Sequence, residues 1–309
     1  MQTSAAPKLR PQTKPSPGRG LWSQVRQNYA AYLFLAPKAI LFLLFVAFPV
    51  VWAFGVAFQK YTVLLDSRWV GLDNFIRITE SGIYPIAFKN TIKYTLVTVP
   101  GNVLLALILA TAIYPLSARA QTFFRAAFYL PGVVSAVVIA MVWRWLYSQN
   151  GLFNGMISMM GFDPIPWLTS SAWSIWSIIL MALLTPPGGG IIYYLAAMGS
   201  IPKDLYEAAD IDGASALQKW WRITLPLLKP TTFYLTILGT IGSFQVFTSV
   251  LILTNGGPGH SSRTLVSLIY DTAFRDGDFG YASAQGIVLF LMIMVVAVFQ
   301  YRFLRGEED

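Results

Sequence analysis

The chain has 309 residues, of which 55% are hydrophobic and only 12% are charged, whereas soluble domains carry about 25% charged residues; the composition therefore predicts a membrane protein. The formal charge of +8 does not indicate nucleic-acid binding, because the basic residues gather at the ends of apolar segments instead of forming a stripe. With no cysteine, the chain has no disulfide, thiolate nucleophile or cysteine-based metal site.

Residues 1–20 contain four prolines and four basic residues with almost nothing apolar. This composition predicts a disordered basic tail. The apolar run that follows is too long for a secretory signal and lacks a cleavage site of small residues. We expect a transmembrane domain over residues 21–306 and a short acidic end over residues 307–309. The stretch from Leu21 to Tyr29 is compatible with an interfacial helix or with a plain linker.

Six apolar segments follow, each able to supply the ~20 residues that a helix needs to cross the hydrocarbon. They lie near residues 30–58, 86–113, 121–147, 172–198, 231–254 and 283–304. The sequence therefore predicts an all-α integral membrane protein with about six transmembrane helices. Pro37, Pro49 and Pro100 predict kinks whose freed carbonyls need neighbours, which favours a bundle. The distribution of lysine and arginine favours cytoplasmic N- and C-termini.

The fourth apolar segment is interrupted by the run from Thr185 to Gly190, which holds two prolines and three glycines. Neither residue type sustains a helix well. Non-helical backbone at this depth is tolerated where it is buried in protein or lines a watery cavity. Gly189 and Gly190 are therefore candidates for a substrate path. The alternative is a kink that only lets helices approach closely.

The loop over residues 199–229 is the longest polar interruption in the second half of the chain. Ser200 is expected to cap a helix that starts at Pro202. Gly213 is expected to end that helix in the left-handed conformation.

A second short helix is predicted directly after this glycine. Ser215 and Gln218 have the spacing of a capping box, and Pro226 is expected to end the helix. The loop is thus predicted to form a helical hairpin that presents acidic side chains outward.

The fifth apolar segment carries Ser243, Gln245 and Thr248, with Phe244 among them. Polar groups are costly in lipid and usually face the interior of a bundle. Hydroxyl, amide and phenyl groups suit a sugar, which offers hydroxyls and C–H faces. We therefore assign these four residues to the substrate path, with helix–helix hydrogen bonding as the alternative. Two weaker candidates, which are equally compatible with interface anchors, are Tyr193 and Trp143.

Enzyme signatures are missing from the sequence, which has neither a GxxxxGK[ST] phosphate loop nor an HExxH motif. The single histidine, His260, is expected to be solvated in a polar loop, as are Asp276 and Asp278. An integral-membrane transferase would need a cluster of ionisable groups at one membrane face, which the sequence lacks. A scaffold or sensor subunit stays open as a third interpretation.

Several motifs resemble those of one family. Glu207-Ala208-Ala209 followed by Asp212-Gly213-Ala214 is similar to the EAA signature of binding-protein-dependent ABC importer permeases, and Leu225-Pro226 stands at the matching distance. Residues 200–203, 253–258 and 280–284 are typical of the sugar-uptake branch, specifically its maltose-type first permease. The resemblance extends over roughly residues 25 to 305.

The resemblance implies a type I importer permease fold, located in the inner membrane of a bacterium or archaeon. The implied partners are a second homologous permease, two ATP-binding subunits and an extracytoplasmic substrate-binding protein, but no nucleic acid. ATP and Mg would be bound by the ATPase, so no cofactor is expected in this chain. The residues implied to couple to the ATPase, from the cytoplasmic hairpin, are Glu207, Ala208, Ala209, Asp210, Asp212, Gly213, Ala214, Leu225 and Pro226.

The resemblance also implies a carbohydrate substrate. In maltose-type permeases the segment that matches Ser243, Phe244 and Gln245 supplies substrate contacts. No lysine or arginine lies mid-span beside Gln245, which favours a neutral mono- or oligosaccharide. Polyols and glycerol phosphate-type substrates are the alternatives. Family members carry bulkier or polar residues where Gly189 and Gly190 stand, so a roomier path is expected here.

Overall fold

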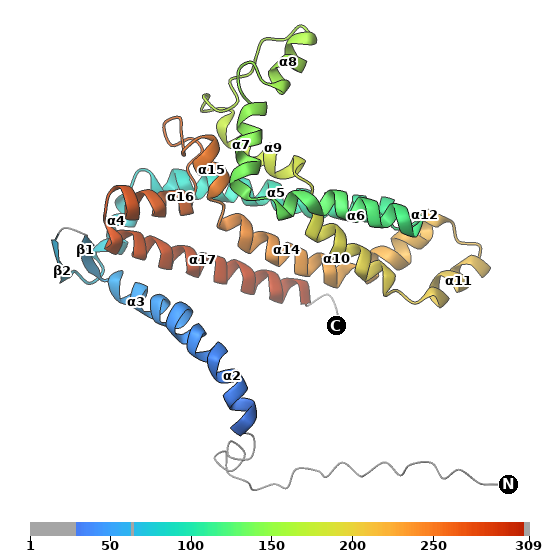
Figure 1. Cartoon of the computed structure of the whole chain (residues 1–309), viewed down its shortest axis with the longest axis horizontal. Helices are drawn as coiled ribbons and strands as arrows, with labels where there is room; N and C mark the ends of the chain where they lie inside the picture. The colour runs from blue at the N-terminus through green and yellow to red at the C-terminus, as the bar shows by residue number, and fades with distance from the viewer. Residues whose placement is uncertain (1–28, 63–64, 306–309) are drawn as a thin grey trace. The chain divides into compact units, whose positions relative to one another are not determined.

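The computed structural model describes residues 29–62 and 65–305. The chain divides into two compact units, the first up to Ala53 and the second from Phe54 onward, and each is described by itself. The described residues are mostly helical, as expected, with a small two-stranded sheet in addition (Figure 1). The predicted basic tail, most of the stretch that begins at Leu21, and the acidic end lie outside the described residues.

The first unit is an apolar helix with one irregular turn. It runs as α2 (Tyr29–Phe42), the π-helical turn η1 (Leu43–Ala47) and α3 (Phe48–Val56), which continues into the second unit. The π-turn lies directly before Pro49, whose missing N–H frees a carbonyl in the preceding turn. The expected irregularity is therefore present at Pro49, whereas α2 continues through Pro37.

The second unit begins with a β-hairpin that the sequence analysis did not predict. Strands β1 (Gln59–Thr62) and β2 (Leu65–Trp69) pair antiparallel, and helix α4 (Asp73–Glu80) follows. The buried Asn74 donates hydrogen bonds of 2.9 Å to the carbonyls of Ala57 and Gln59. This amide fastens α4 to the start of the hairpin.

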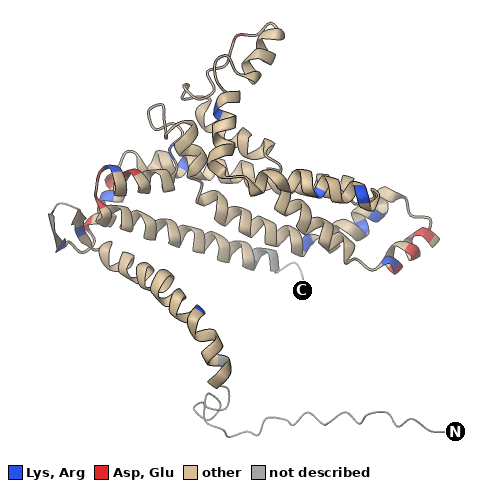
Figure 2. Cartoon of the chain, viewed as in Figure 1, with Lys and Arg blue, Asp and Glu red and all other residues tan. Residues whose placement is uncertain are grey.

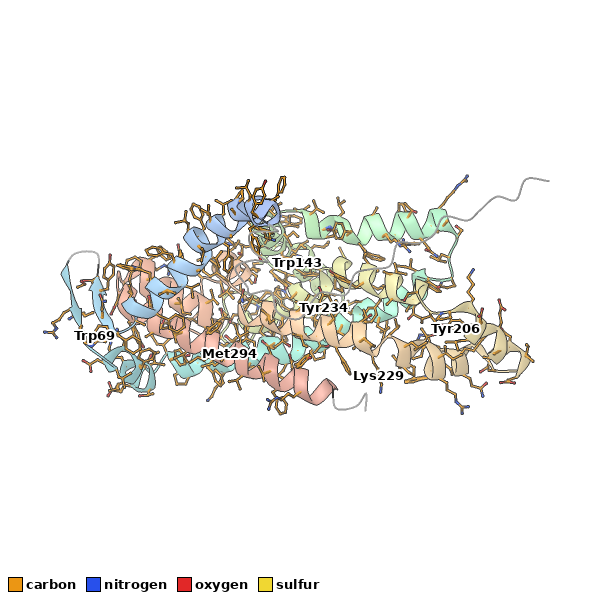
Figure 3. The ribbon with its side chains drawn as sticks, turned by 90° about the horizontal axis from the view of Figure 1, so that it is seen from below. Trp69, Trp143, Tyr206, Lys229, Tyr234 and Met294 are labelled. Carbon is orange, nitrogen blue, oxygen red and sulfur yellow. The ribbon has the colours of Figure 1, made fainter. Side chains whose placement is uncertain are left out.

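Helix α5 (Tyr84–Ile113) is the central element of the second unit. It packs against α14 (Lys229–Phe244), α10 (Gly188–Gly199) and α9 (Ser174–Leu184), and it runs through Pro100 without interruption. Figure 3 shows Tyr234 of α14 between Trp69 and Tyr206, which lie at opposite ends of this unit. The remaining elements of the second unit are α6 (Ala118–Val133), α7 (Ala136–Leu146), α8 (Leu152–Met159), α11 (Lys203–Ile211), α12 (Ala216–Lys219), η2 (Trp220–Thr224), α13 (Leu225–Leu227), α15 (Thr248–Leu253), α16 (Leu265–Tyr270), η3 (Asp271–Arg275) and α17 (Phe279–Arg305).

Four stretches of the described residues are helical, long and apolar enough to cross a membrane: Tyr32–Val56, Tyr84–Ile113, Ser174–Gly199 and Phe279–Arg302. The pair α6–α7, bent by 93°, is a fifth candidate. The expected fifth span, residues 231–254, is divided because α14 ends at Phe244 and α15 begins at Thr248. At this break the Thr264 hydroxyl donates to the Val246 carbonyl at 3.0 Å, so a side chain takes the place of a helical amide.

Charged residues of the second unit gather at its two ends. Figure 2 shows them near the β-hairpin and α4 at one end and on α11 and α12 at the other, with few between. This is the distribution expected for a bundle whose middle lies in lipid.

Candidate functional site

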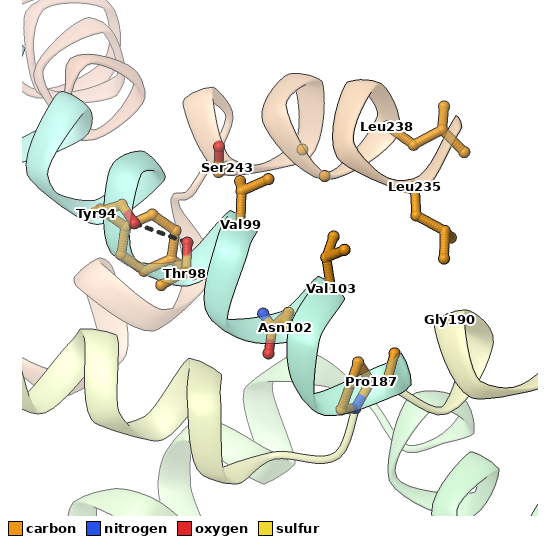
Figure 4. Close-up of a pocket in the computed structure, with 13 residues that line it drawn as sticks. Tyr94, Thr98, Val99, Asn102, Val103, Pro187, Gly190, Leu235, Leu238 and Ser243 are labelled. Carbon is orange, nitrogen blue, oxygen red and sulfur yellow. Dashed lines mark hydrogen bonds between the residues drawn. The ribbon is translucent and has the colours of Figure 1, made fainter. Parts of the chain in front are cut away.

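A cavity of about 360 Å³ lies between α5, α10 and α14 (Figure 4). It borders the break in the fourth span, where α9 ends at Leu184 and α10 begins at Gly188. The predicted interruption is therefore present, and its second half forms one wall of the cavity. Thirteen residues line this space: Tyr94, Thr98, Val99, Asn102, Val103, Ala106, Pro187, Gly190, Leu235, Leu238, Gly239, Gly242 and Ser243.

Glycines set the spacing of the helices around this cavity. A Cβ at Gly190 would lie 3.0 Å from the Cβ of Ala106, and a Cβ at Gly239 would lie 3.3 Å from Val99 Cγ1. Both distances are tighter than ordinary contacts, so α10 and α14 approach α5 closely because these positions have no side chain. Gly190 therefore has a packing role as well as a place on the cavity wall.

The threonine and serine hydroxyl groups on the cavity wall are held by the protein. Thr98 donates to the Tyr94 carbonyl at 2.7 Å. Ser243 Oγ lies 2.9 Å from Thr95 Oγ1 and 2.8 Å from a carbonyl of its own helix. Asn102 differs, because its Oδ1 is buried and has no hydrogen-bond partner within the described part of the chain. An unpaired buried acceptor is costly, so this carbonyl is suited to receive a hydrogen bond from a ligand or a water molecule.

The residues that the sequence analysis assigned to the substrate path do not all reach this cavity. Ser243 and Gly190 line it. Gln245 is exposed, one turn beyond the lining residue Gly242, and Tyr193 is exposed with its ring 5.3 Å from that of Tyr234. Tyr193 lies on α10, one turn after the lining residue Gly190, and Gln245 directly follows α14.

The other assigned residues lie elsewhere. Gly189 is exposed at the start of α10 and Thr248 is half-buried at the start of α15. Phe244 is 2% exposed and packs in an apolar cluster with Tyr84 and Leu268. Trp143 packs in an aromatic cluster with Tyr147 and Phe153.

Sequence reasoning missed Asn102. It is a polar residue within the apolar second segment and could have been found by the criterion that was applied to the fifth segment.

The hairpin between α10 and α14 largely has the predicted form. Gly213 has φ of +73° between α11 and α12, as expected. Ser215 and Gln218 form the predicted capping box, with hydrogen bonds of 3.3 and 2.7 Å. Lys219 Nζ lies 2.6 Å from Asp210 Oδ1, so an ion pair joins the two helices of the hairpin.

Two details of this hairpin differ from the prediction. Ser200 does not cap α11, because its hydroxyl donates to the Ala197 carbonyl at the end of α10. Pro226 does not end the second helix. The chain passes through the π-turn η2 and α13 into α14, with Leu228 as the only residue between these two helices. A π-turn before a proline absorbs the lost hydrogen bond and lets the helical run continue.

Side chains link this hairpin to the bundle. Trp220 Nε1 donates to Thr111 Oγ1 of α5 at 3.4 Å, whereas the contact of 2.8 Å between Tyr206 Oη and Thr224 Oγ1 joins the two arms of the hairpin itself. Trp220 also packs against the apolar cluster around Leu228. Its neighbour Trp221 is 57% exposed.

The outer surface of the hairpin is both acidic and apolar. Glu207 and Asp212 are exposed, and Glu207 has no ion-pair partner among the described residues. Ile211 is 88% exposed and Leu217 is 67% exposed. Large apolar side chains left in solvent next to charged ones are typical of a protein–protein contact. Ile211 and Leu217 are therefore added to the residues expected to couple the permease to the ATPase, although the sequence analysis did not single them out.

Two residues expected to be solvated in the loops are partly enclosed. Asp278 pairs with Arg77 at 2.9 Å and also accepts a hydrogen bond from the Tyr281 amide at the start of α17. His260 is half-buried, and its Nδ1 is buried with no hydrogen-bond partner among the described residues. The expectation of free solvation is wrong for both: Asp278 is held by Arg77 of α4, and the His260 ring is partly enclosed.

An apolar bundle with charged ends, a cavity between three of its helices and a polar hairpin at one end defines a membrane transporter subunit. The chain belongs to the family of binding-protein-dependent transport system inner membrane components, whose model matches residues 102–306. The predicted ABC importer permease with an all-α type I fold is thereby confirmed.

Relatives match nearly the whole chain. The arabinooligosaccharides transport system permease protein AraP of Bacillus subtilis (strain 168) is 33% identical over 276 residues, which cover 87% of this chain and 86% of that protein. The crystal structure of a bacterial ABC transporter involved in the import of the acidic polysaccharide alginate contains a chain that is 27% identical. It has a TM-score of 0.82 and covers 93% of this chain and 98% of that one.

A further crystal structure shows a bacterial alginate ABC transporter in complex with an alginate pentasaccharide-bound periplasmic protein. Its matching chain is also 27% identical, with a TM-score of 0.80, and the match covers 91% of this chain and 95% of that one.

Proposed function

We propose that this permease forms part of the translocation path for a neutral mono- or oligosaccharide in an ATP-driven importer. The observation that carries the proposal is the chemistry of the cavity between α5, α10 and α14. Its thirteen lining residues, all described, include amide, hydroxyl and phenol groups but no Asp, Glu, Lys, Arg or His. A phosphate or carboxylate group at this depth would lack a cationic partner.

The relatives support a saccharide rather than another neutral solute, because AraP is named for the transport of arabinooligosaccharides and the similar solved transporter imports a polysaccharide. Alginate is described as acidic, and the lack of cationic residues around the present cavity argues for an uncharged sugar here. Glycerol phosphate-type substrates are disfavoured for the same reason. Polyols fit the same chemistry and are distinguished by the experiment below.

Exposed side chains of α10 and α14 support a second permease. Leu238 lines the cavity, Tyr193 and Gln245 lie one turn from the lining residues Gly190 and Gly242, and all three side chains are exposed. A path through lipid must be enclosed by protein, so a homologous subunit is proposed to cover these side chains. Gln245 and Tyr193 would then border the path between the two subunits, together with Ser243 and Gly190.

The hairpin supports coupling to a separate ATPase. Its exposed Glu207, Ile211 and Leu217 combine charge with apolar surface, and Gly213 sets the angle between its helices. We propose that two ATP-binding subunits, which hold ATP and Mg, contact the hairpin residues from Glu207 to Ala214. The lysine and arginine distribution supports a cytoplasmic hairpin and cytoplasmic termini. A binding protein would deliver the sugar to the opposite side, as the alginate complex includes such a protein.

The test begins with the binding protein encoded beside this permease. Its thermal unfolding is measured with a panel of mono-, di- and trisaccharides, polyols and glycerol 3-phosphate. Compounds that raise the unfolding temperature are then offered to proteoliposomes that contain the complete transporter. ATP-dependent uptake of an uncharged saccharide is expected. Uptake of only a polyol or a phosphate ester would contradict the proposal.

A further inference from the structure

A second hollow lies at a different place in the fold. Its volume is about 520 Å³, and it shares no lining residue with the cavity between α5, α10 and α14. It is bounded by the end of α7, by the loop before α9 and by the end of α15. Residues 143–173, which contain α8, are called the α8 lobe below.

A buried amide holds the walls of this hollow in place. Asn154 is 1% exposed, and its Nδ2 donates to the carbonyls of Ser148 at 3.2 Å and Ile165 at 3.1 Å. Its Oδ1 accepts hydrogen bonds from the Ile165 amide at 2.9 Å and from Trp167 Nε1 at 3.1 Å. Both segments of the α8 lobe that line the hollow are therefore fixed to one fully paired side chain.

Aromatic packing fixes the indole that lines the hollow. The ring of Trp167 lies 5.4 Å from that of Tyr147 and 5.5 Å from that of Trp173. Tyr147 in turn donates to the Ser177 carbonyl of α9 at 2.8 Å. A wall built in this way is preformed, as the walls of ligand sites usually are. The volume of the hollow falls within the ordinary range for ligand sites, about 300–1,000 Å³.

Several polar side chains around the hollow are free to bind a ligand. Gln149 and Thr169 line it, are exposed, and form no hydrogen bond with another described residue. Arg144 is exposed, and the one hydrogen bond that it makes within the described part of the chain is a long contact of 3.4 Å to the Ile252 carbonyl. The lining residues include no carboxylate, so the hollow is not suited to a metal ion.

We propose that this hollow is a second saccharide subsite, at which a sugar unit is held before it enters the path. An indole face accepts the C–H side of a pyranose or furanose ring. An amide, a hydroxyl and a guanidinium group supply donors and acceptors for its hydroxyls. The proposal rests on the proposed function, because only a saccharide importer would bring this ligand to the α8 lobe.

The experiment uses the complete transporter in lipid nanodiscs without its binding protein. The probes are the mono-, di- and trisaccharide of the sugar that the transporter imports, and their dissociation constants are measured by saturation-transfer NMR. The double variant Gln149→Leu with Thr169→Val removes two ligand groups from exposed positions and is expected to fold normally. Its dissociation constant for the trisaccharide is expected to rise roughly tenfold, as for two lost hydrogen bonds. The matched control is Asn150→Leu, because Asn150 is the exposed neighbour of Gln149 and does not line the hollow.

The outcomes separate this inference from the proposed function. Absence of saccharide uptake by the wild-type transporter would defeat both. Normal uptake with equal dissociation constants for the wild type and the double variant would defeat only the subsite. A further measurement is the affinity of the sugar-free binding protein for the nanodiscs. If the double variant weakens this affinity and leaves saccharide binding unchanged, the hollow is a protein contact and the inference is overturned.

Discussion

Substitution of Gly213 tests whether the hairpin acts through its fixed geometry. At φ of +73°, a residue with a Cβ is strained by about 1–2 kcal/mol. Apart from its two chain neighbours, no described residue has an atom within 4 Å of the place where a Cβ would stand, so the strain arises from the backbone and not from a clash. Gly213→Val is therefore expected to lower the population of the observed hairpin roughly five- to thirtyfold relative to other conformations.

The assay is sugar uptake per ATP hydrolysed, measured in proteoliposomes that contain the complete transporter. For Gly213→Val we expect uptake to fall, by no more than the same five- to thirtyfold, while the permease still inserts and basal ATP hydrolysis persists. Asparagine tolerates the left-handed region, so Gly213→Asn is the matched control and is expected to retain most of the uptake. Equal loss in both variants would show that bulk against a partner matters and would refute the backbone argument, as would normal uptake by Gly213→Val.

Three further substitutions test other parts of the site. Lys219→Met removes the ion pair with Asp210, whose side chain is 62% exposed, so we expect the free energy of unfolding to fall by no more than about 1 kcal/mol. Thermal unfolding in low and in high salt measures this change. A larger destabilisation that salt does not affect would contradict the interpretation of the pair as a weak surface ion pair. Asn102→Leu removes the unpaired acceptor from the cavity and should raise the KM for uptake severalfold with assembly intact, whereas unchanged kinetics would remove it from the path. Gln245→Leu should alter the relative uptake rates of the tested sugars. An unchanged order of these rates would exclude contact between Gln245 and the sugar.

The hairpin shows what local sequence can predict. The turn at Gly213 and the capping box of Ser215 and Gln218 depend only on residues within a few positions, and both are present. The error at Pro226 has a local cause too, because a proline ends a helix unless the preceding turn widens. The turn before it is π-helical, and sequence spacing did not reveal this widening.

Long-range contacts account for the features that the sequence did not predict. The fifth span breaks after Phe244, where the hydroxyl of Thr264 takes the Val246 carbonyl from another segment. The β-hairpin is held by Asn74 of the next helix. In both cases a polar side chain distant in sequence supplies the hydrogen bond, so neither periodicity nor propensity contained the information.

The two proposed functional regions share helices, and this gives the hairpin a physical route to the cavity. The first hairpin helix, α11, follows α10, whose opening turn places Gly190 on the cavity wall. The second hairpin helix continues through α13 and Leu228 into α14, whose last turn places Ser243 on the same wall. Between the hairpin and the cavity, α10 and α14 are joined by a hydrogen bond of 2.9 Å that links Tyr194 and Thr232.

A tilt of the hairpin therefore acts on two walls of the cavity together, because both begin or end at its base. Packed helices shift between discrete arrangements more readily than they deform. The hydrogen bond between Tyr194 and Thr232 would keep α10 and α14 moving as one body against α5. Tyr194→Phe is then expected to reduce uptake per ATP without changing sugar binding, since its hydroxyl faces Thr232 and does not line the cavity. Weakened binding with unchanged coupling would instead place this pair in the architecture of the cavity and not in the transmission of motion.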